Sequence, residues 1–382
     1  MPGRLLTTAS GNPAFLPSPL PPKLDLGEPE LLDSLLLAAE NVSALGQAAN
    51  DIRNSALIAA ISNLRANIEA QMSSRIEGIE TTITDLLWAY RQERRGSVTN
   101  LIVSRNLEVL NYLHALRIGQ ARLLGSDALP ICSRLIRELH ARLMQDVRGA
   151  TLDPGEFRRV QNSIGRSGAS EADSIYTPPP PQEVAPAMSE LEKFINRDDI
   201  NIFVKTALVH YQFEAIHPFS DGNGRVGRLL VTLMLLEGSR LSQPLIYPSA
   251  YLEEHRQQYY ELLLRVSTQG DWHAWLVFFL KGIASQASSA LERVGLLREL
   301  HGHYREQLVR RNAPIRLERL LDHIFSNPLI GQPEIMEHLG VSRTTAFRYM
   351  EHLLSTGMLE PLHPQQSNHR WYVARELLNI LE

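Results

Sequence analysis

The chain of 382 residues contains a single cysteine, Cys132. One cysteine can form neither an intramolecular disulfide nor a zinc cluster of several thiolates, so disulfide-stapled and zinc-finger classes are excluded. The opening residues, Met1 to Arg4, are not followed by the long apolar stretch and small-residue cleavage site of a secretory signal. We therefore expect a protein of the reducing cytoplasm.

Long apolar runs and a strong charge of either sign are also lacking. No segment approaches the roughly 18 uninterrupted apolar residues that span a bilayer, so we expect no membrane anchor. The formal net charge is −4, which gives no general attraction for nucleic acid or for an anionic membrane surface. Any such partner would have to be bound by a local patch. The length predicts two or three domains.

The chain is instead rich in helical periodicity. Prolines between residues 11 and 30 predict an extended lead, and glycines with the run Pro178 to Pro181 predict a loop between residues 151 and 187 that has room only for a short hairpin. Apolar residues recur at helical spacing over 29–88, 100–124, 129–148, 189–210, 224–238, 253–267 and 272–299. The fold class is therefore mostly α.

The tail from Pro314 has a pattern of its own. Three short helical segments precede two expected strands, Leu359 to Leu362 and Arg370 to Val373, and the segment after Gly340 looks like a turn into a recognition helix. This order resembles a winged helix-turn-helix. Residues 314–382 contain six Arg, no Lys and eight acidic residues, which is a poor balance for binding a phosphate backbone. Such domains also bind proteins.

The most informative segment runs from His217 to Arg228. Gly222 and Gly224 permit backbone conformations that turn successive N–H groups inward, and a helix that begins there adds the positive end of its dipole. Arg225 and Arg228 are three residues apart, so a helix places them on one face, where guanidinium groups suit phosphate oxygens. We therefore predict a site for a polyphosphate.

Two further residues of this segment carry chemistry. Asp221 offers the hard oxygen that Mg²⁺ takes from a protein when it is bound to a polyphosphate. His217 is a neutral imidazole near pH 7 and can accept a proton from a hydroxyl. Taken singly, each residue has an ordinary explanation as part of a turn, as a solvated charge or as a structural histidine, and only their combination in one window favours a site.

That combination resembles the signature of the Fic family, and the likeness spans roughly residues 100–285. Eight residues carry it: His217, Phe219, Asp221, Gly222, Asn223, Gly224, Arg225 and Arg228. The resemblance implies that the histidine is the general base, the aspartate holds Mg²⁺, and the Gly-Asn-Gly backbone and both arginines bind the phosphates of ATP. A related class that transfers phosphate has Lys at the position of Gly224. The resemblance therefore implies transfer of AMP to a Ser, Thr or Tyr hydroxyl of a protein, including the enzyme itself.

The resemblance also implies a flap and an adenine site. Ser174, Ile175 and Tyr176 correspond to a β-hairpin that lies over ATP and clamps the target's backbone as an added strand, with an ordinary loop as the alternative. Tyr259 and Tyr260 stand where relatives contact the adenine, although aromatic residues on a helix are by default part of a core.

A second motif lies upstream, from Ser73 to Gly78. The four-residue spacing puts Ser73 and Glu77 on one helix face, and Gly78 suits a helix end. The segment resembles the inhibitory motif of Fic proteins in which the inhibitory helix is N-terminal to the core of the same chain. We expect Glu77 to pair with Arg228 and occupy the place of a terminal phosphate of ATP. A helix cap or an exposed pair is the alternative.

These patterns suggest three regions: 1–99 with the proline-rich lead and inhibitory helices, 100–299 as catalytic core, and 300–382 as linker helix and winged helix. Two other functions remain open. In the first, the same site removes AMP from a modified protein by hydrolysis, with Glu77 positioning the water. Alternatively, residues 314–382 bind DNA and the core is a sensor. A homodimer is compatible with either function.

Overall fold

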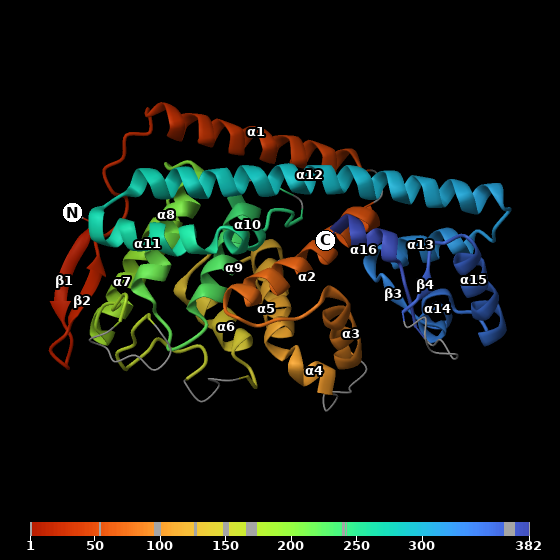
Figure 1. Ribbon diagram of the computed structural model, residues 1–382, viewed down its shortest axis with the longest axis horizontal. Coiled ribbons are helices and arrows are strands. Elements are labelled where there is room, and N and C mark those ends of the chain that lie inside the picture. Colours follow the sequence, from red (N-terminus) through yellow and green to blue (C-terminus); the bar gives the residue numbers. More distant parts are fainter. Residues whose placement is uncertain are drawn as a thin grey trace.

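The computed structural model describes residues 2–52, 55–94, 101–125, 128–147, 153–165, 174–238, 241, 243–362 and 371–381. Most of them are helical, as the periodicity predicts (Figure 1). The predicted boundary between residues 99 and 100 lies outside the described residues, as do Arg370 of the second expected strand in the tail and part of the predicted flap.

The N-terminal lead is extended but forms a hairpin that the sequence did not indicate. Strands β1 (Gly3–Thr7) and β2 (Pro13–Pro17) pair antiparallel, with Gly3 opposite Pro17. The amide of Phe15 donates a hydrogen bond to the carbonyl of Thr177, so this hairpin lies against the region of the predicted flap. Helix α1 (Pro29–Asp51) then runs along α12 (Trp272–Arg310), as Figure 1 shows.

Three helices lead from α1 into the centre of the molecule. Helix α2 (Ser55–Ile76) packs against α5 (Leu107–Leu124) and α10 (Ser249–Glu254). Helix α3 (Ile83–Arg94) and the short α4 (Leu101–Arg105) follow α2. The buried residues of α2 belong to the same apolar core as those of the later helices.

The central helices are α8 (Ile202–Ile216) and α9 (Asn223–Gly238), which pack on each other. Nearly every side chain of both is buried, which is typical of a helix that is apolar all round. Helices α6 (Ser133–Leu143), α7 (Pro181–Ile195) and α11 (Arg256–Gln269) surround them. The loop between α8 and α9 therefore connects two deeply buried helices.

Two helix predictions need correction. The expected helix from 189 to 210 is two helices, α7 and α8, separated near Asn201, whose side chain accepts a hydrogen bond from the amide of Phe203 and caps α8. The predicted loop between residues 151 and 187 ends earlier than expected, because α7 begins at Pro181, within the proline run. Proline is tolerated there, since the first amides of a helix have no partner within it.

Helix α12 runs through the expected domain boundary at residues 299 and 300 and ends at Arg310. It is long and apolar enough to cross a membrane by length and composition, with a mean hydropathy of 1.2 over its most apolar window. However, 67% of that window is buried inside the protein. Most of this window is therefore covered by other parts of the protein.

The tail contains the three helices that the sequence predicts, α13 (Arg316–Ser326), α14 (Gln332–Leu339) and α15 (Arg343–Ser355). Strands β3 (Leu329–Ile330), β4 (Glu360–Pro361) and β5 (Tyr372–Val373) form an antiparallel sheet in the order β3-β5-β4, and α16 (Arg375–Leu381) ends the chain. Neither β3 nor α16 was expected. Helix α13 packs on α2, which ties this C-terminal region to the rest.

Candidate active site

His217 stands at the C-terminal end of α8 in the left-handed backbone conformation, with φ of 50°. Its carbonyl accepts a hydrogen bond of 2.8 Å from Nε of Arg158, which fixes the turn. Its Nδ1 lies 3.3 Å from the carbonyl oxygen of Glu214. A carbonyl can only accept, so Nδ1 carries the proton and Nε2 has a free lone pair. Burial lowers the pKa of His217 to about 4, so the imidazole is neutral at pH 7.

The loop from His217 to α9 is held by Asn223. The side-chain oxygen of Asn223 accepts from the amide of Phe219, and its nitrogen donates to the carbonyl of the same residue, both at 2.8 Å. Phe219 is fully buried and stacks on His140 with ring centroids 3.7 Å apart, as expected of a core residue. Gly222 has φ of 76°, a conformation that strains other residues. The loop therefore presents the N-terminus of α9 in a fixed orientation.

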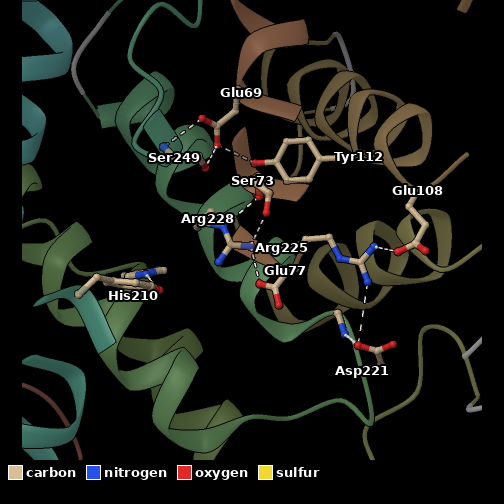
Figure 2. Close-up of polar contacts among 12 residues, drawn as sticks. Glu69, Ser73, Glu77, Glu108, Tyr112, His210, Asp221, Arg225, Arg228 and Ser249 are labelled. Carbon is tan, nitrogen blue, oxygen red and sulfur yellow. Dashed lines mark hydrogen bonds and ion pairs between the residues drawn. The ribbon is translucent and has the colours of Figure 1, made fainter. Parts of the chain in front are cut away.

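Arg225 and Arg228 both lie on α9 but contact different parts of the molecule (Figure 2). Arg225 donates to Glu108 of α5 at 2.8 Å, and its other terminal nitrogen lies 4.0 Å from Asp221. Arg228 is 1% exposed and contacts Ser73 and Glu77 of the N-terminal region. The spacing predicts that both arginines lie on one face of the helix. In the structure, however, the two side chains bind different partners.

Asp221 lies at the entrance of the loop, and its side chain is half-exposed. One carboxylate oxygen accepts a hydrogen bond of 2.6 Å from the amide of Gly222. No group of three or more His, Cys, Asp or Glu that could hold a metal ion occurs among the described residues. The described residues therefore fit a Mg²⁺ ion that takes one ligand from the carboxylate of Asp221 and others from the phosphates of the substrate.

The pair that we expect between Glu77 and Arg228 is present. Glu77 follows the last turn of α2, and its Oε1 accepts a hydrogen bond of 2.7 Å from Arg228 (Figure 2). Ser73 accepts two more bonds from the same guanidinium, through its side chain and its carbonyl, each at 2.9 Å. Burial opposes ionisation of Glu77, but the charge and hydrogen bond of Arg228, together with the nearby Arg225 and His217, outweigh it and hold the pKa of the carboxyl below its ordinary value.

The carboxylate of Glu77 also lies against the backbone where α9 begins. A Cβ atom added to Gly224 would collide with Oε1 of Glu77 and with the guanidinium of Arg228. Glycine is therefore needed at this position for the observed contact. The negative charge occupies the positive end of the helix dipole, where a phosphate would otherwise be favoured.

A buried cluster fixes α2, which carries Ser73 and leads into Glu77. Glu69 accepts hydrogen bonds from the hydroxyl groups of Tyr112 at 2.9 Å and Ser249 at 2.6 Å, and from the amide of Ser249 at 3.1 Å (Figure 2). One turn earlier, Arg65 donates to the carbonyl of Leu245. These contacts connect α2 to α5 and to the segment around α10.

A pocket of about 550 Å³ opens beside these groups. Its lining includes His217, Gly224, Arg228 and Glu77, together with Ile175 and Tyr176 of the predicted flap. Ile164 and Tyr176 form a single antiparallel bridge, so the described part of the flap is a minimal hairpin. The hydroxyl of Ser174 contacts that of Thr177 at 2.8 Å and does not line the pocket.

The two tyrosines that the resemblance singles out differ in position. Tyr260 is 44% exposed and lines the pocket with Leu263 and Leu264. Tyr259 also lines the pocket but is 1% exposed, and its hydroxyl is bonded to Nε2 of His210 at 2.8 Å. Tyr260 is therefore placed to meet an aromatic ring in the pocket, whereas Tyr259 belongs largely to the core.

Three polar residues of the site were not identified from the sequence. Arg158 fixes the backbone at His217, Glu108 pairs with Arg225, and Glu214 lines the pocket one turn before His217. Arg158 and Glu108 are far along the chain from their partners, and Glu214 lies on a helix whose other residues are mostly apolar. Arg158 ends the segment Gly155-Glu156-Phe157-Arg158, which shares the resemblance to the Fic family, but that likeness assigned it no role. The sequence contains no local signal for Glu108, whereas Glu214 is detectable as an acidic residue within a mostly apolar helix.

Comparison with known proteins agrees with this geometry. Residues 130–235 match the Fic/DOC family, and residues 32–121 match the N-terminal region of that family. The chain therefore carries a Fic/DOC domain preceded by its N-terminal region. It is 30% identical over 190 residues to "Protein adenylyltransferase Fic" of Aedes aegypti and 31% identical over 189 residues to that of Drosophila grimshawi. These matches cover 49% of this chain but only 34% and 35% of the relatives, so the chain spans about a third of their length.

Solved structures support the fold. A Fic family protein from Desulfovibrio desulfuricans superposes with a TM-score of 0.57 and 19% identity, over 93% of this chain and 98% of that chain. A Fic-domain signalling protein from Bacteroides thetaiotaomicron superposes with a TM-score of 0.51 and 20% identity, over 67% and 97%. The first match shows that the fold extends over nearly the whole chain.

Proposed function

We propose that this chain is a protein adenylyltransferase, which moves AMP from ATP to a Ser, Thr or Tyr hydroxyl of a protein, including itself. The observation that carries the proposal is the gathering of a neutral, half-buried histidine, a helix N-terminus and the buried Arg228 around one pocket. Relatives named for this activity support it. We further propose that Glu77 inhibits the reaction.

His217 would act as the general base of this reaction. Its Nε2 accepts the proton of the attacking hydroxyl, because Nδ1 already donates to the carbonyl of Glu214. The hydroxyl oxygen forms a bond to the α-phosphorus of ATP, and the bond from that phosphorus to the bridging oxygen breaks. Pyrophosphate leaves with the electron pair, and AMP remains on the protein.

The phosphates would bind where α9 begins. The unpaired amides of its first turn and the dipole favour negative charge there. Arg228 suits the terminal phosphate, and Arg225, held by Glu108, supports the charge near Asp221. Mg²⁺, when bound, neutralises charge on the phosphates, and Asp221 is the carboxylate that would hold it.

Inhibition by Glu77 would be competition for a single guanidinium. Arg228 cannot serve the carboxylate of Glu77 and a phosphate at once, and the carboxylate also occupies the space above Gly224. ATP would then bind in an unproductive position or not at all. The same carboxylate is close enough to influence the titration of His217, so removal of AMP with water activated by Glu77 is the competing direction.

The test is incubation of the chain with Mg²⁺ and ATP labelled in the α-phosphate, followed by mass spectrometry of the protein. A mass increase of one AMP on a hydroxyl side chain, absent in His217→Ala, supports transfer. If the chain takes no label alone or from a lysate, but releases AMP from a protein already modified, the hydrolase direction replaces the proposal.

DNA binding by residues 314–382 is measured separately. The acidic balance of that segment makes weak, salt-sensitive binding the expected result. Retention of the full chain on duplex DNA at physiological salt, with no AMP transfer by any variant, would favour the regulator instead.

A further inference from the structure

Glu214 places a carboxyl group inside the pocket, one turn of α8 before His217. The other side chains of α8 are buried with the exceptions of Ile202 and Lys205, and most of them are apolar. The Oε1 atom of Glu214 is buried and has no hydrogen-bond partner among the described residues. A buried carboxyl oxygen without a partner costs stability, which calls for an explanation at this position.

The packing of α9 keeps this carboxyl in the pocket. A Cβ atom added to Gly227 would collide with Oε1 of Glu214, so the carboxyl lies directly on the backbone of α9. Burial raises the pKa of Glu214 to about 7, partly offset by Arg228 and reinforced by Glu77. Near neutral pH the group is therefore present in both protonation states, and either state can form a hydrogen bond with a hydroxyl.

The pocket has two chemically different ends. His217, Gly224 and Arg228 lie at the end that suits phosphates, whereas Ile175, Leu263 and Leu264 provide an apolar surface beside Tyr260 that suits a base. In ATP the sugar joins the α-phosphate to the base. Glu214 precedes His217 by one helical turn and lies near Arg228, so it faces the part of the ligand next to the phosphates.

Other polar side chains in this part of the pocket already have partners. The hydroxyl of Tyr211 is bonded to that of Ser267 at 2.9 Å, and the hydroxyl of Tyr176 donates to the carbonyl of Ala215 at 2.8 Å. Gln257 donates to Glu261 at 2.7 Å. Among the described residues that line this region, Glu214 thus keeps a buried oxygen without a partner, in addition to the free lone pair on Nε2 of His217.

We propose that Glu214 binds a ribose hydroxyl of ATP and makes the site selective for ribonucleotides over deoxyribonucleotides. This inference rests on the proposed function, since it assumes that the pocket holds ATP. Glu214 would also position the α-phosphate, because this phosphate is attached to the ribose and a held ribose restricts where it can lie.

The test is direct binding, measured by calorimetry in the presence of Mg²⁺, with ATP, 2′-deoxyATP and 3′-deoxyATP. The full chain carrying Glu77→Gly is the parent, so that the phosphate site is open. Glu214→Leu removes the hydrogen bond, Glu214→Gln keeps a donor and an acceptor, and Gln257→Leu is a matched change at the pocket's edge. Thermal unfolding checks that each variant is folded, and Glu214→Ala replaces the leucine variant if that one is not.

We expect the parent to bind ATP about tenfold more tightly than at least one deoxy analogue, the ratio that one hydrogen bond typically gives. Glu214→Leu should lose this ratio by weakening ATP alone, whereas Glu214→Gln and Gln257→Leu should keep it. A parent without discrimination, or a leucine variant that keeps the ratio or weakens all three ligands equally, overturns the inference. Binding of ATP without AMP transfer overturns only the proposed function, and no binding of ATP overturns both.

Discussion

Replacing Glu77 by glycine should raise AMP transfer by about 10- to 100-fold. The change removes a charge-assisted hydrogen bond of 2.7 Å to Arg228, whose side chain is 1% exposed. Such a bond contributes about 1.5–3 kcal/mol. Since each 1.4 kcal/mol is tenfold in an equilibrium, the population of sites with Arg228 available to a phosphate rises by one to two powers of ten. Ser73 still contacts Arg228, so the guanidinium stays in place.

The assay is the initial rate of self-modification with α-labelled ATP, over a range of ATP concentrations. We expect the rate to change more than the affinity for ATP, because the competition concerns the productive position of the phosphates. Glu80→Gly, an exposed carboxylate three residues further on, is the matched control and should not activate. The double variant Glu77→Gly with Arg228→Ala should lose the gain. If Glu77→Gly is no faster than the wild type on any protein, including itself, the inhibitory role of this carboxylate is refuted.

Four further outcomes follow from the site. His217→Ala should lower transfer by ~10²–10⁴-fold without a change in thermal unfolding, and activity close to wild type would exclude its role as base. Asp221→Ala should shift the Mg²⁺ concentration needed for half-maximal transfer upward, about tenfold or more, so an unchanged Mg²⁺ titration would contradict the metal role. Because burial lowers the pKa of His217 to about 4 from an unfolded value near 6.5, the base stays neutral as pH falls through 6.5. The kcat/KM should therefore be flat between about pH 6 and 8 and fall only below about pH 5, and a midpoint near 6.5 would show that the base is not this buried imidazole. A chain that ends at Asn312, just beyond α12, should still modify itself once Glu77 is also replaced, and a folded but inactive truncated chain would show that the C-terminal region is part of the catalytic unit.

Local patterns account for what the sequence predicted well. The glycines and Asn223 between α8 and α9, and the four-residue spacing of Ser73 and Glu77, need only neighbouring residues to be interpreted. The pairing of Glu77 with Arg228 joins residues 151 positions apart, yet the family resemblance was enough to predict it. Glycine at 224 is explained by the same contact, because any Cβ there would meet the carboxylate.

Long-range packing accounts for what the sequence missed. Nothing near Glu69 indicates that it will meet Tyr112 and Ser249, and nothing near Arg158 indicates that its Nε will bind the carbonyl of His217. Arg225 was expected to share a face with Arg228. Its partner Glu108 was not predicted, because Glu108 lies on α5, far from Arg225 along the sequence. The break between α7 and α8 was missed because both flanking segments have helical periodicity.

The anchoring of α2 has a consequence for the speed of switching. Withdrawing this helix would break the buried contacts of Glu69 and Arg65 and uncover part of the common core, which is a slow and costly event. Glu77, in contrast, follows the last helical turn, and Gly78 next to it has φ of 84°. Its carboxylate can leave Arg228 by rotation about its own side-chain bonds, a motion that takes picoseconds to nanoseconds in exposed residues. The proposed inhibition would then act at each encounter with ATP as a rapid equilibrium within a rigid frame, and any lasting activation would require a ligand or modification that keeps the carboxylate away.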